Sequence, residues 1–232
     1  MNETAIRMEE QIISLFPGME TLICHGWILK KMERHFCVYP LYYKFSDGNI
    51  PDNIQRCEEI SRQSGMGCVF CIVEHTNYHL SSILTDTGYA LWKCGIVGEL
   101  CLPDSESSVC CVEEGHNRLS LRKGADEGNV EYVMAEDGTV IGIKRQGLLF
   151  LPDGNLPEDA DLEDILQFSK INSIKKILAD IPETEELPEK YKQAGFIRIY
   201  LYRCYQKGGE ILPKTGGEIL QKEGGLRNGF TE

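Results

Sequence analysis

The stretch 147–181, GLLFLPDGNLPEDADLEDILQFSKINSIKKILADI, restricts the fold more than any other part of the sequence. It begins with a short apolar run, Gly147 to Leu151, whose flanking Gly and Pro residues predict a buried strand. Apolar residues at helical spacing then predict a helix over about 162–170, and a second strand follows at about 175–181. Two strands joined by a helical crossover are expected to be parallel, or nearly parallel, neighbours. The sequence therefore predicts an α/β fold, with a ligand-binding site past the carboxyl end of the first strand.

The composition is that of a globular protein and narrows the classes of partner. The chain has 232 residues, 42% apolar and 26% charged, with a net charge of −12 at pH 7. Nucleic-acid binding needs clustered Lys and Arg, so this charge argues against it. The candidate partners are a small-molecule or peptide amine and a second copy of the chain, as a homo-oligomer.

Neither a membrane nor an export route is predicted. No apolar run approaches the roughly 20 residues that a membrane helix needs, and the polar N-terminus lacks the pattern of a secretory signal. Ten cysteines in such a chain are most simply reduced thiols. We therefore expect a cytoplasmic location.

The predicted elements repeat one order: strand, helix, strand, helix, Gly-aromatic pair and strand. This order occurs over about 35–100 and again over about 147–205, with Gly88 and Gly195 in matching places. A Gly between a helix and a strand predicts a left-handed helix cap. We therefore expect a mixed sheet flanked by helices, built from two similar halves packed together. The predicted domains are an N-terminal half (1–102), a linker (103–129), a C-terminal half (130–207) and a flexible Gly-rich tail (208–232).

Several segments resemble the GNAT superfamily of N-acetyltransferases. They are DGTVIG, the strand–loop–helix–strand stretch that follows it, YKQAGF, and the aromatic strand that ends the pattern. The segments HGWILKKMERHFCVYPL, GCVFCIV and LTDTGY are similar to the N-terminal half of a tandem-type subgroup, in which a partial GNAT-like unit precedes a complete one. The resemblance covers about residues 8–207. It implies a GNAT-like fold and transfer of an acyl group from acetyl-CoA to an amine.

The resemblance also implies where acetyl-CoA would bind. The family holds its pyrophosphate on backbone N–H groups of a loop patterned R/Q-x-x-G-x-G/A, between the first strand and the helix. The implied cofactor contacts are Leu149 and Leu151 in the strand, Gly154 and Asn155 in the loop, and Thr184, which stands at the place of an Asn of many members. The family's general acid, a Tyr five residues before the Phe of its Gly-Phe pair, falls on Tyr191. The alternative for Tyr191 is a ring that packs on the sheet.

The loop itself departs from the family pattern. Asp153 stands at the basic position, and Leu156 and Glu158 stand in place of the two glycines. Pro157 also lacks an N–H donor. The carboxylates of the loop are Asp153, Glu158, Asp159 and Asp161. The sequence therefore leaves two functions open: an N-acyltransferase that acts on an amine, and a non-catalytic relative that binds another ligand or a protein partner.

One cysteine–histidine spacing suggests zinc, but we expect no metal site there. Cys68, Cys71, His75 and His79 follow the pattern C-x2-C-x3-H-x3-H. Tetrahedral zinc needs four side chains that converge to within about 2.0–2.3 Å of one point. Cys68 and Cys71 should instead point to opposite faces of one strand. The simpler interpretation is buried thiols and surface histidines.

Overall fold

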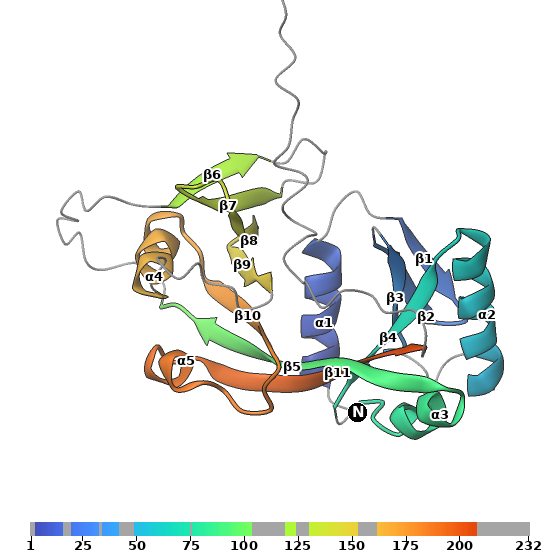
Figure 1. The fold of residues 1–232 in the computed structure, drawn as a ribbon. Helices are drawn as coiled ribbons and strands as arrows, with labels where there is room; N and C mark the ends of the chain where they lie inside the picture. Colours follow the sequence, from blue (N-terminus) through green and yellow to red (C-terminus); the bar gives the residue numbers. More distant parts are fainter. Residues whose placement is uncertain are drawn as a thin grey trace, which may run out of the picture. The chain divides into compact units, whose positions relative to one another are not determined.

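The structure is a computed structural model of the chain, and it describes residues 3–15, 20–32, 34–41, 49–74, 76–103, 119–123, 130–152 and 162–207 (Figure 1). The helices are α1 (Glu3–Leu15), α2 (Ile50–Gln63), α3 (Leu80–Asp86), α4 (Leu162–Ile171) and α5 (Glu189–Gln193). The strands are β1 (Thr21–Cys24), β2 (Trp27–Lys31), β3 (His35–Tyr39), β4 (Gly67–Val73), β5 (Tyr89–Cys101), β6 (Leu119–Lys123), β7 (Glu131–Ala135), β8 (Val140–Arg145), β9 (Leu148–Leu151), β10 (Lys176–Pro182) and β11 (Ile197–Lys207). The predicted α/β class, a mixed sheet with helices, is confirmed.

The chain forms two compact units. Unit 1 consists of the described residues within 1–97, 182–187 and 198–214, and unit 2 of those within 98–181, 188–197 and 215–232. The units interleave along the chain because β11 from Arg198 onward belongs to unit 1, where its residues 202–206 pair with β4.

The predicted domain boundaries follow chain order and stay a prediction. Within the predicted linker, Leu119–Lys123 forms β6, which pairs antiparallel with β7. The rest of the linker from 104 onward, and the predicted tail at 208–232, lie outside the described residues.

Unit 1 is a mixed sheet with helices on both faces. Its strands follow the order β1-β2-β3-β4-β11-β5, with β3 parallel to β4 and β4 antiparallel to β11. The helix α1 covers one face, where the buried hydroxyl of Tyr200 donates to the carboxylate of Glu9 and the amine of Lys30 donates to the carbonyl of Ile13 at 2.6 Å. The helices α2 and α3 cover the other face.

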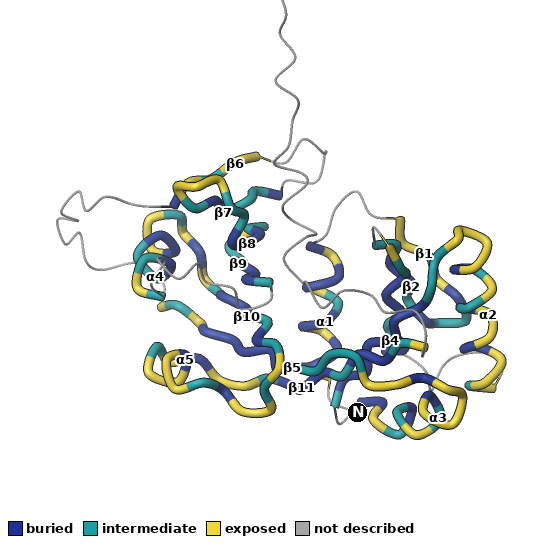
Figure 2. The backbone as a smooth tube through the Cα atoms, in the orientation of Figure 1, coloured by how far each residue is buried: buried dark blue, intermediate teal, exposed yellow. Residues whose placement is uncertain are grey.

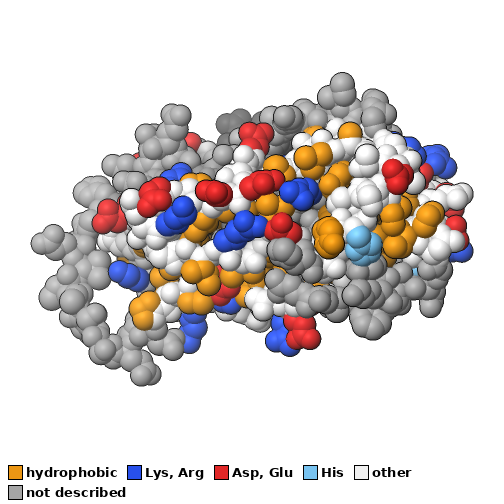
Figure 3. All heavy atoms as spheres, turned by 90° about the horizontal axis from the view of Figure 1, so that it is seen from below, with side chains coloured by type: hydrophobic (Ala, Val, Ile, Leu, Met, Phe, Trp, Pro, Cys, Tyr) orange, Lys and Arg blue, Asp and Glu red, His pale blue; other side chains and the backbone are white. Residues whose placement is uncertain are grey.

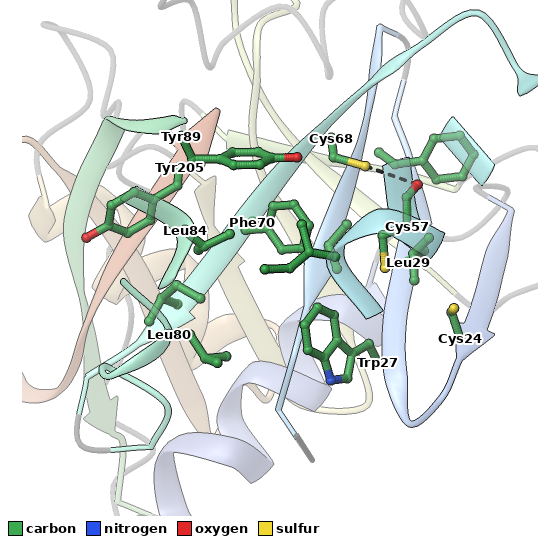
Figure 4. Packing of buried hydrophobic residues seen from close by; sticks show 14 residues of the cluster. Cys24, Trp27, Leu29, Cys57, Cys68, Phe70, Leu80, Leu84, Tyr89 and Tyr205 are labelled. Carbon is green, nitrogen blue, oxygen red and sulfur yellow. Dashed lines mark hydrogen bonds between the residues drawn. The ribbon is translucent and has the colours of Figure 1, made fainter. Parts of the chain in front are cut away.

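The core under α2 and α3 is centred on Phe70 (Figure 4). Its ring meets Trp27 and Tyr89 edge to face, with centroids 6.1 and 5.0 Å apart. Figure 2 shows β3 and β4 mostly buried, and α2 and α3 each with buried residues toward the core and exposed residues elsewhere. The buried strand β4 coincides with the predicted apolar run Cys68 to Val73.

Unit 2 contains the predicted parallel pair. Its strands follow the order β5-β10-β9-β8-β7-β6, and β9 runs parallel to β10, as the stretch 147–181 predicts. The Asp137-Gly138 turn joins β7 and β8, also as expected. The two predicted helix caps, Gly88 and Gly195, have φ of 88° and 90°, which confirms their left-handed conformation.

Within the described part of the chain, no helix has both the length and the apolar character needed to cross a membrane.

Candidate functional site

The candidate site begins where the parallel pair of unit 2 ends. The last paired residues are Leu151 of β9 and Ala179 of β10. Strand β10 then continues through Asp180 to Pro182, while β9 ends at Leu151. This is the carboxyl end of β9, the place that the sequence predicts for a ligand.

Two of the predicted cofactor contacts, Leu149 and Leu151, lie inside the packed sheet. Their side chains are 0% and 1% exposed. A Cβ atom added at Gly142 of β8 would lie 2.9 Å from Cδ1 of Leu149 and 3.1 Å from Cδ2 of Leu151. Strand β9 also pairs with β8 on one side and β10 on the other. These side chains are engaged in packing, and their contact with a cofactor stays a prediction.

The start of α4 carries negative charge. The helix begins at Leu162, with Glu163 and Asp164 in its first turn and Lys170 in its last turn, an arrangement that suits the helix dipole. Over residues 146–169 the sequence has six Asp and Glu residues and no Lys or Arg. The predicted contacts Gly154 and Asn155 belong to this stretch and lie outside the described residues.

These residues do not fit the pyrophosphate of acetyl-CoA as the GNAT family holds it. A phosphate at the start of α4 would meet the carboxylates of the first turn, Glu163 and Asp164, with no Lys or Arg nearby in the sequence. Each like-charge contact at ~4 Å costs about 1 kcal/mol in water and about 4 kcal/mol at an effective dielectric constant of 20. A family-type phosphate cradle is therefore disfavoured at this place.

Tyr191, the predicted general acid, is a buried residue of α5. Its ring is 1% exposed and packs perpendicular to Phe196, with centroids 5.2 Å apart. The ring of Tyr191 is thus packed in the interior, in line with the alternative that the sequence left open. Burial, and after it the negative charge of Asp180, raise the pKa of the Tyr191 phenol. The hydroxyl is therefore protonated at neutral pH, as a general acid requires; the catalytic role itself stays a prediction.

Asp180 is a residue of this site that sequence reasoning missed. It follows Ala179, the partner of Leu151, and its charge acts on Tyr191. The signal was present, since Asp180 is the one acidic residue in the otherwise apolar end of the strand, ILADI. Asp180 thus connects the end of the parallel pair with Tyr191 within unit 2.

Thr184, the last predicted contact, is engaged with its own loop. Its hydroxyl donates to the carbonyl of Glu186 at 2.7 Å and accepts from the backbone N–H of Glu186 at 3.1 Å. The residue belongs to unit 1, whereas Leu149, Leu151 and Tyr191 belong to unit 2. Its role toward a cofactor stays a prediction.

Cys68 and Cys71, whose spacing resembles that of zinc ligands, point to opposite faces of β4, as expected. The thiol of Cys68 donates to the carbonyl of Cys57 at 3.3 Å, on the α2 face, while Cys71 contacts Cys204 on the other face. His75 lies outside the described residues, and the ring of His79 packs against Tyr78. In the ranges that the structure describes, no three His, Cys, Asp or Glu side chains are grouped so that they could hold a metal ion.

Basic side chains of β11 are paired with carboxylates. Arg198 lies 2.6 Å from Glu74, and Arg203 lies 3.0 Å from Glu185. The face seen in Figure 3 likewise shows acidic and basic side chains interspersed, without a gathered basic patch among its described residues. This surface differs from the continuous basic stripe typical of nucleic-acid binders.

Comparisons with known proteins show which known fold this chain resembles. No family model matches the sequence, and no curated protein matches it significantly. Solved structures do match. A GCN5-related N-acetyltransferase from Sphaerobacter thermophilus is 11% identical, with a TM-score of 0.51, over 89% of this chain and 90% of that one. Another from Kribbella flavida is 9% identical, with a TM-score of 0.50, over 88% of this chain and 96% of that one. At these identities the likeness is one of fold, and this chain has the fold of the GCN5-related N-acetyltransferases.

Proposed function

We propose that this chain is a GNAT-fold protein that binds an amine at the carboxyl end of β9 and does not hold acetyl-CoA as the family does. The observation that carries the proposal is the charge that follows β9. The connection to α4 has four carboxylates, the first turn of α4 adds Glu163 and Asp164, and residues 146–169 contain no Lys or Arg. Such a segment repels phosphates and attracts ammonium groups.

The surroundings of Asp180 support the same class of ligand. This half-buried carboxylate follows the last residue pair of β9 and β10, at the place where the fold receives ligands. Together with Glu163 and Asp164 it adds negative charge in unit 2. A small-molecule or peptide amine carries the complementary charge.

Titration with spermidine in a calorimeter tests the amine site. We expect binding that weakens with added salt, because surface charge interactions are screened. The double variant Glu163→Gln/Asp164→Asn should weaken binding several-fold, whereas Glu59→Gln on the exposed side of α2 should leave it unchanged. Equal loss in both variants would indicate non-specific attraction, and the proposal would then be wrong.

A second candidate, acyl transfer to an amine, is favoured by Tyr191. Its phenol is kept neutral by burial and by Asp180, so it can donate a proton to the leaving group of an acyl donor. The donor would have to bind without the family's phosphate cradle. Replacing Tyr191 with Phe keeps the ring that packs on Phe196 and removes the proton, so turnover should fall by about 10²-fold or more while the chain still folds. An active Tyr191→Phe variant would exclude this role.

A cytoplasmic location and self-association into a homo-oligomer complete the proposal. The cysteines in the described ranges are all free thiols, which suits a reducing compartment. Cell fractionation and sedimentation of the purified chain test these two points.

A further inference from the structure

Three cysteines of unit 1 gather on the face of the sheet that is opposite to α2 and α3. We call Cys37 of β3, Cys71 of β4 and Cys204 of β11 the thiol cluster. Each is 7% exposed. Their sequence neighbours Phe36, Phe70 and Tyr205 point into the core under α2 and α3, so strand alternation turns the three thiols to the other side.

The thiol cluster is a connected chain of hydrogen bonds that ends on an imidazole. The thiol of Cys204 donates to Sγ of Cys71 at 3.4 Å, and Cys71 is hydrogen-bonded in turn to Cys37. Sγ of Cys37 lies 3.3 Å from Nε2 of His35, two residues earlier on the same strand face. The described residues thus contain a Cys–His pair with two further thiols in line behind it.

Among the three thiols of the cluster, the surroundings favour the thiolate form of Cys37. The hydrogen bond with Cys71, and the hydrogen bond and charge of His35, hold the pKa of Cys37 well below its usual value, although burial opposes this. Burial alone would lower the pKa of His35, but the contact with Cys37 raises it. The pKa of Cys71 is raised, first by the hydrogen bond with Cys204. Because the thiolate is the reactive form of cysteine, Cys37 is the nucleophile of the cluster.

Only one pair of the cluster has the backbone placement of an unstrained disulfide, so a disulfide of any other pair is a transient intermediate. Cys71 and Cys204 are directly opposite on antiparallel strands. Opposite residues there have Cα atoms about 4.5–5.5 Å apart, within the range of about 4.4–6.8 Å that disulfides span. Cys37 is instead opposite Val69. A Cys37–Cys71 disulfide would therefore join residues that are not opposite, and it would be strained.

We propose that the thiol cluster is a hydroperoxide-reactive site whose oxidation ends in a disulfide between Cys71 and Cys204. The thiolate of Cys37 attacks the terminal oxygen of the hydroperoxide, so an S–O bond forms and the O–O bond breaks. The leaving alkoxide or hydroxide takes the proton of the His35 imidazolium. The product is a sulfenic acid on Cys37 and an alcohol or water.

Two further steps move the oxidation to the favourable pair. Sγ of Cys71 attacks the sulfenic sulfur, an S–S bond forms, and the departing hydroxide takes the proton of Cys71 as water. The thiol of Cys204 then attacks Sγ of Cys71 and displaces Cys37, which takes the proton of Cys204. The net reaction converts one hydroperoxide and two thiols into one disulfide, water and an alcohol or a second water. This site does not depend on the amine proposal.

Mapping of disulfides after brief treatment of the reduced protein with hydrogen peroxide tests the proposal. Mass spectrometry should find the peptides of Cys71 and Cys204 linked in the wild-type chain. An ordinary thiol is only about 3% ionised at pH 7, so Cys37→Ser should slow formation of this disulfide by about tenfold or more. Cys101→Ser, which removes an exposed thiol of unit 2, should leave the rate unchanged.

Two more variants make the test decisive. His35→Gln keeps all three thiols and should also slow the reaction. If Cys37→Ser lowers the melting temperature, His35→Gln tests the Cys–His pair in its place. Cys204→Ser should leave Cys37 as a sulfenic acid, which a dione probe labels, or linked to Cys71. Absence of the Cys71–Cys204 disulfide in the wild-type chain, or an unchanged rate in both Cys37→Ser and His35→Gln, would overturn the proposal.

Discussion

Replacement of Gly142 by Ala probes the packing that holds β9 in unit 2. The added Cβ would lie 2.9 Å from Cδ1 of Leu149, 3.0 Å from the carbonyl oxygen of Phe150 and 3.1 Å from Cδ2 of Leu151. One of these neighbours is backbone, so rotation of a side chain cannot relieve every contact. Overpacking of a tight core typically costs about 1–3 kcal/mol. For a chain of this size that corresponds to a fall in melting temperature of about 2–12 °C.

A double-variant comparison identifies the contact responsible. Leu149→Ala removes Cδ1 and by itself costs about 2–5 kcal/mol. If the steric contact with Leu149 is real, Gly142→Ala should cost less in the Leu149→Ala background than in the wild-type chain, by about 0.5 kcal/mol or more. Thermal and urea unfolding, followed by circular dichroism, give both values. A cost of Gly142→Ala below about 0.5 kcal/mol in the wild-type chain would refute the close approach of β8 and β9.

Further predictions concern the helix cap beside Tyr191, a buried carboxylate and the buried phenols. Gly195→Ala places a side chain at φ 90° and should destabilise the chain by about 1–2 kcal/mol, measured by urea unfolding; an unchanged midpoint would contradict the cap. Glu9→Gln removes the charge that accepts from Tyr200 and should cost about 1.5–3 kcal/mol, with Glu136→Gln, an exposed residue, as the control. Burial is the first cause that raises the pKa of Tyr39, Tyr89 and Tyr191. A raised folded pKa contributes stability that is complete below the unfolded value of about 10 and is lost as pH rises beyond it, so ultraviolet titration should show these phenols ionising only as the chain unfolds. Ionisation of all ten tyrosines near pH 10 in the folded chain would contradict this.

Local signals predicted the parts of the fold that depend on local physics. The apolar runs of β9 and β10 and the helix between them were recognisable, and the pair is parallel as expected. Gly88 and Gly195 marked helix caps because the left-handed conformation excludes most other residues. The opposite directions of Cys68 and Cys71 followed from the period of a strand.

Long-range pairing could not be predicted in the same way. The alternation of β11 indicated a strand but not its partner β4, which draws most of β11 into unit 1. Strand β6 has the sequence LSLRK, whose polar residues resemble a linker, and its ladder with β7 forms the strand. The thiol cluster escaped notice because its members lie on three strands whose register only the structure gives. Asp180 had a local signal, an acidic residue in the apolar run ILADI, but its effect on Tyr191 depends on the fold.

Calorimetry with acetyl-CoA tests the central claim most directly. The connection between β9 and α4 and the first turn of α4 together carry six carboxylates, and residues 146–169 contain no Lys or Arg. We therefore expect no binding heat at cofactor concentrations up to about 1 mM, a limit that corresponds to a binding free energy weaker than about −4 kcal/mol. Saturable binding with a dissociation constant near 1 μM would mean that this end of β9 holds the phosphates after all, and the claim would be wrong.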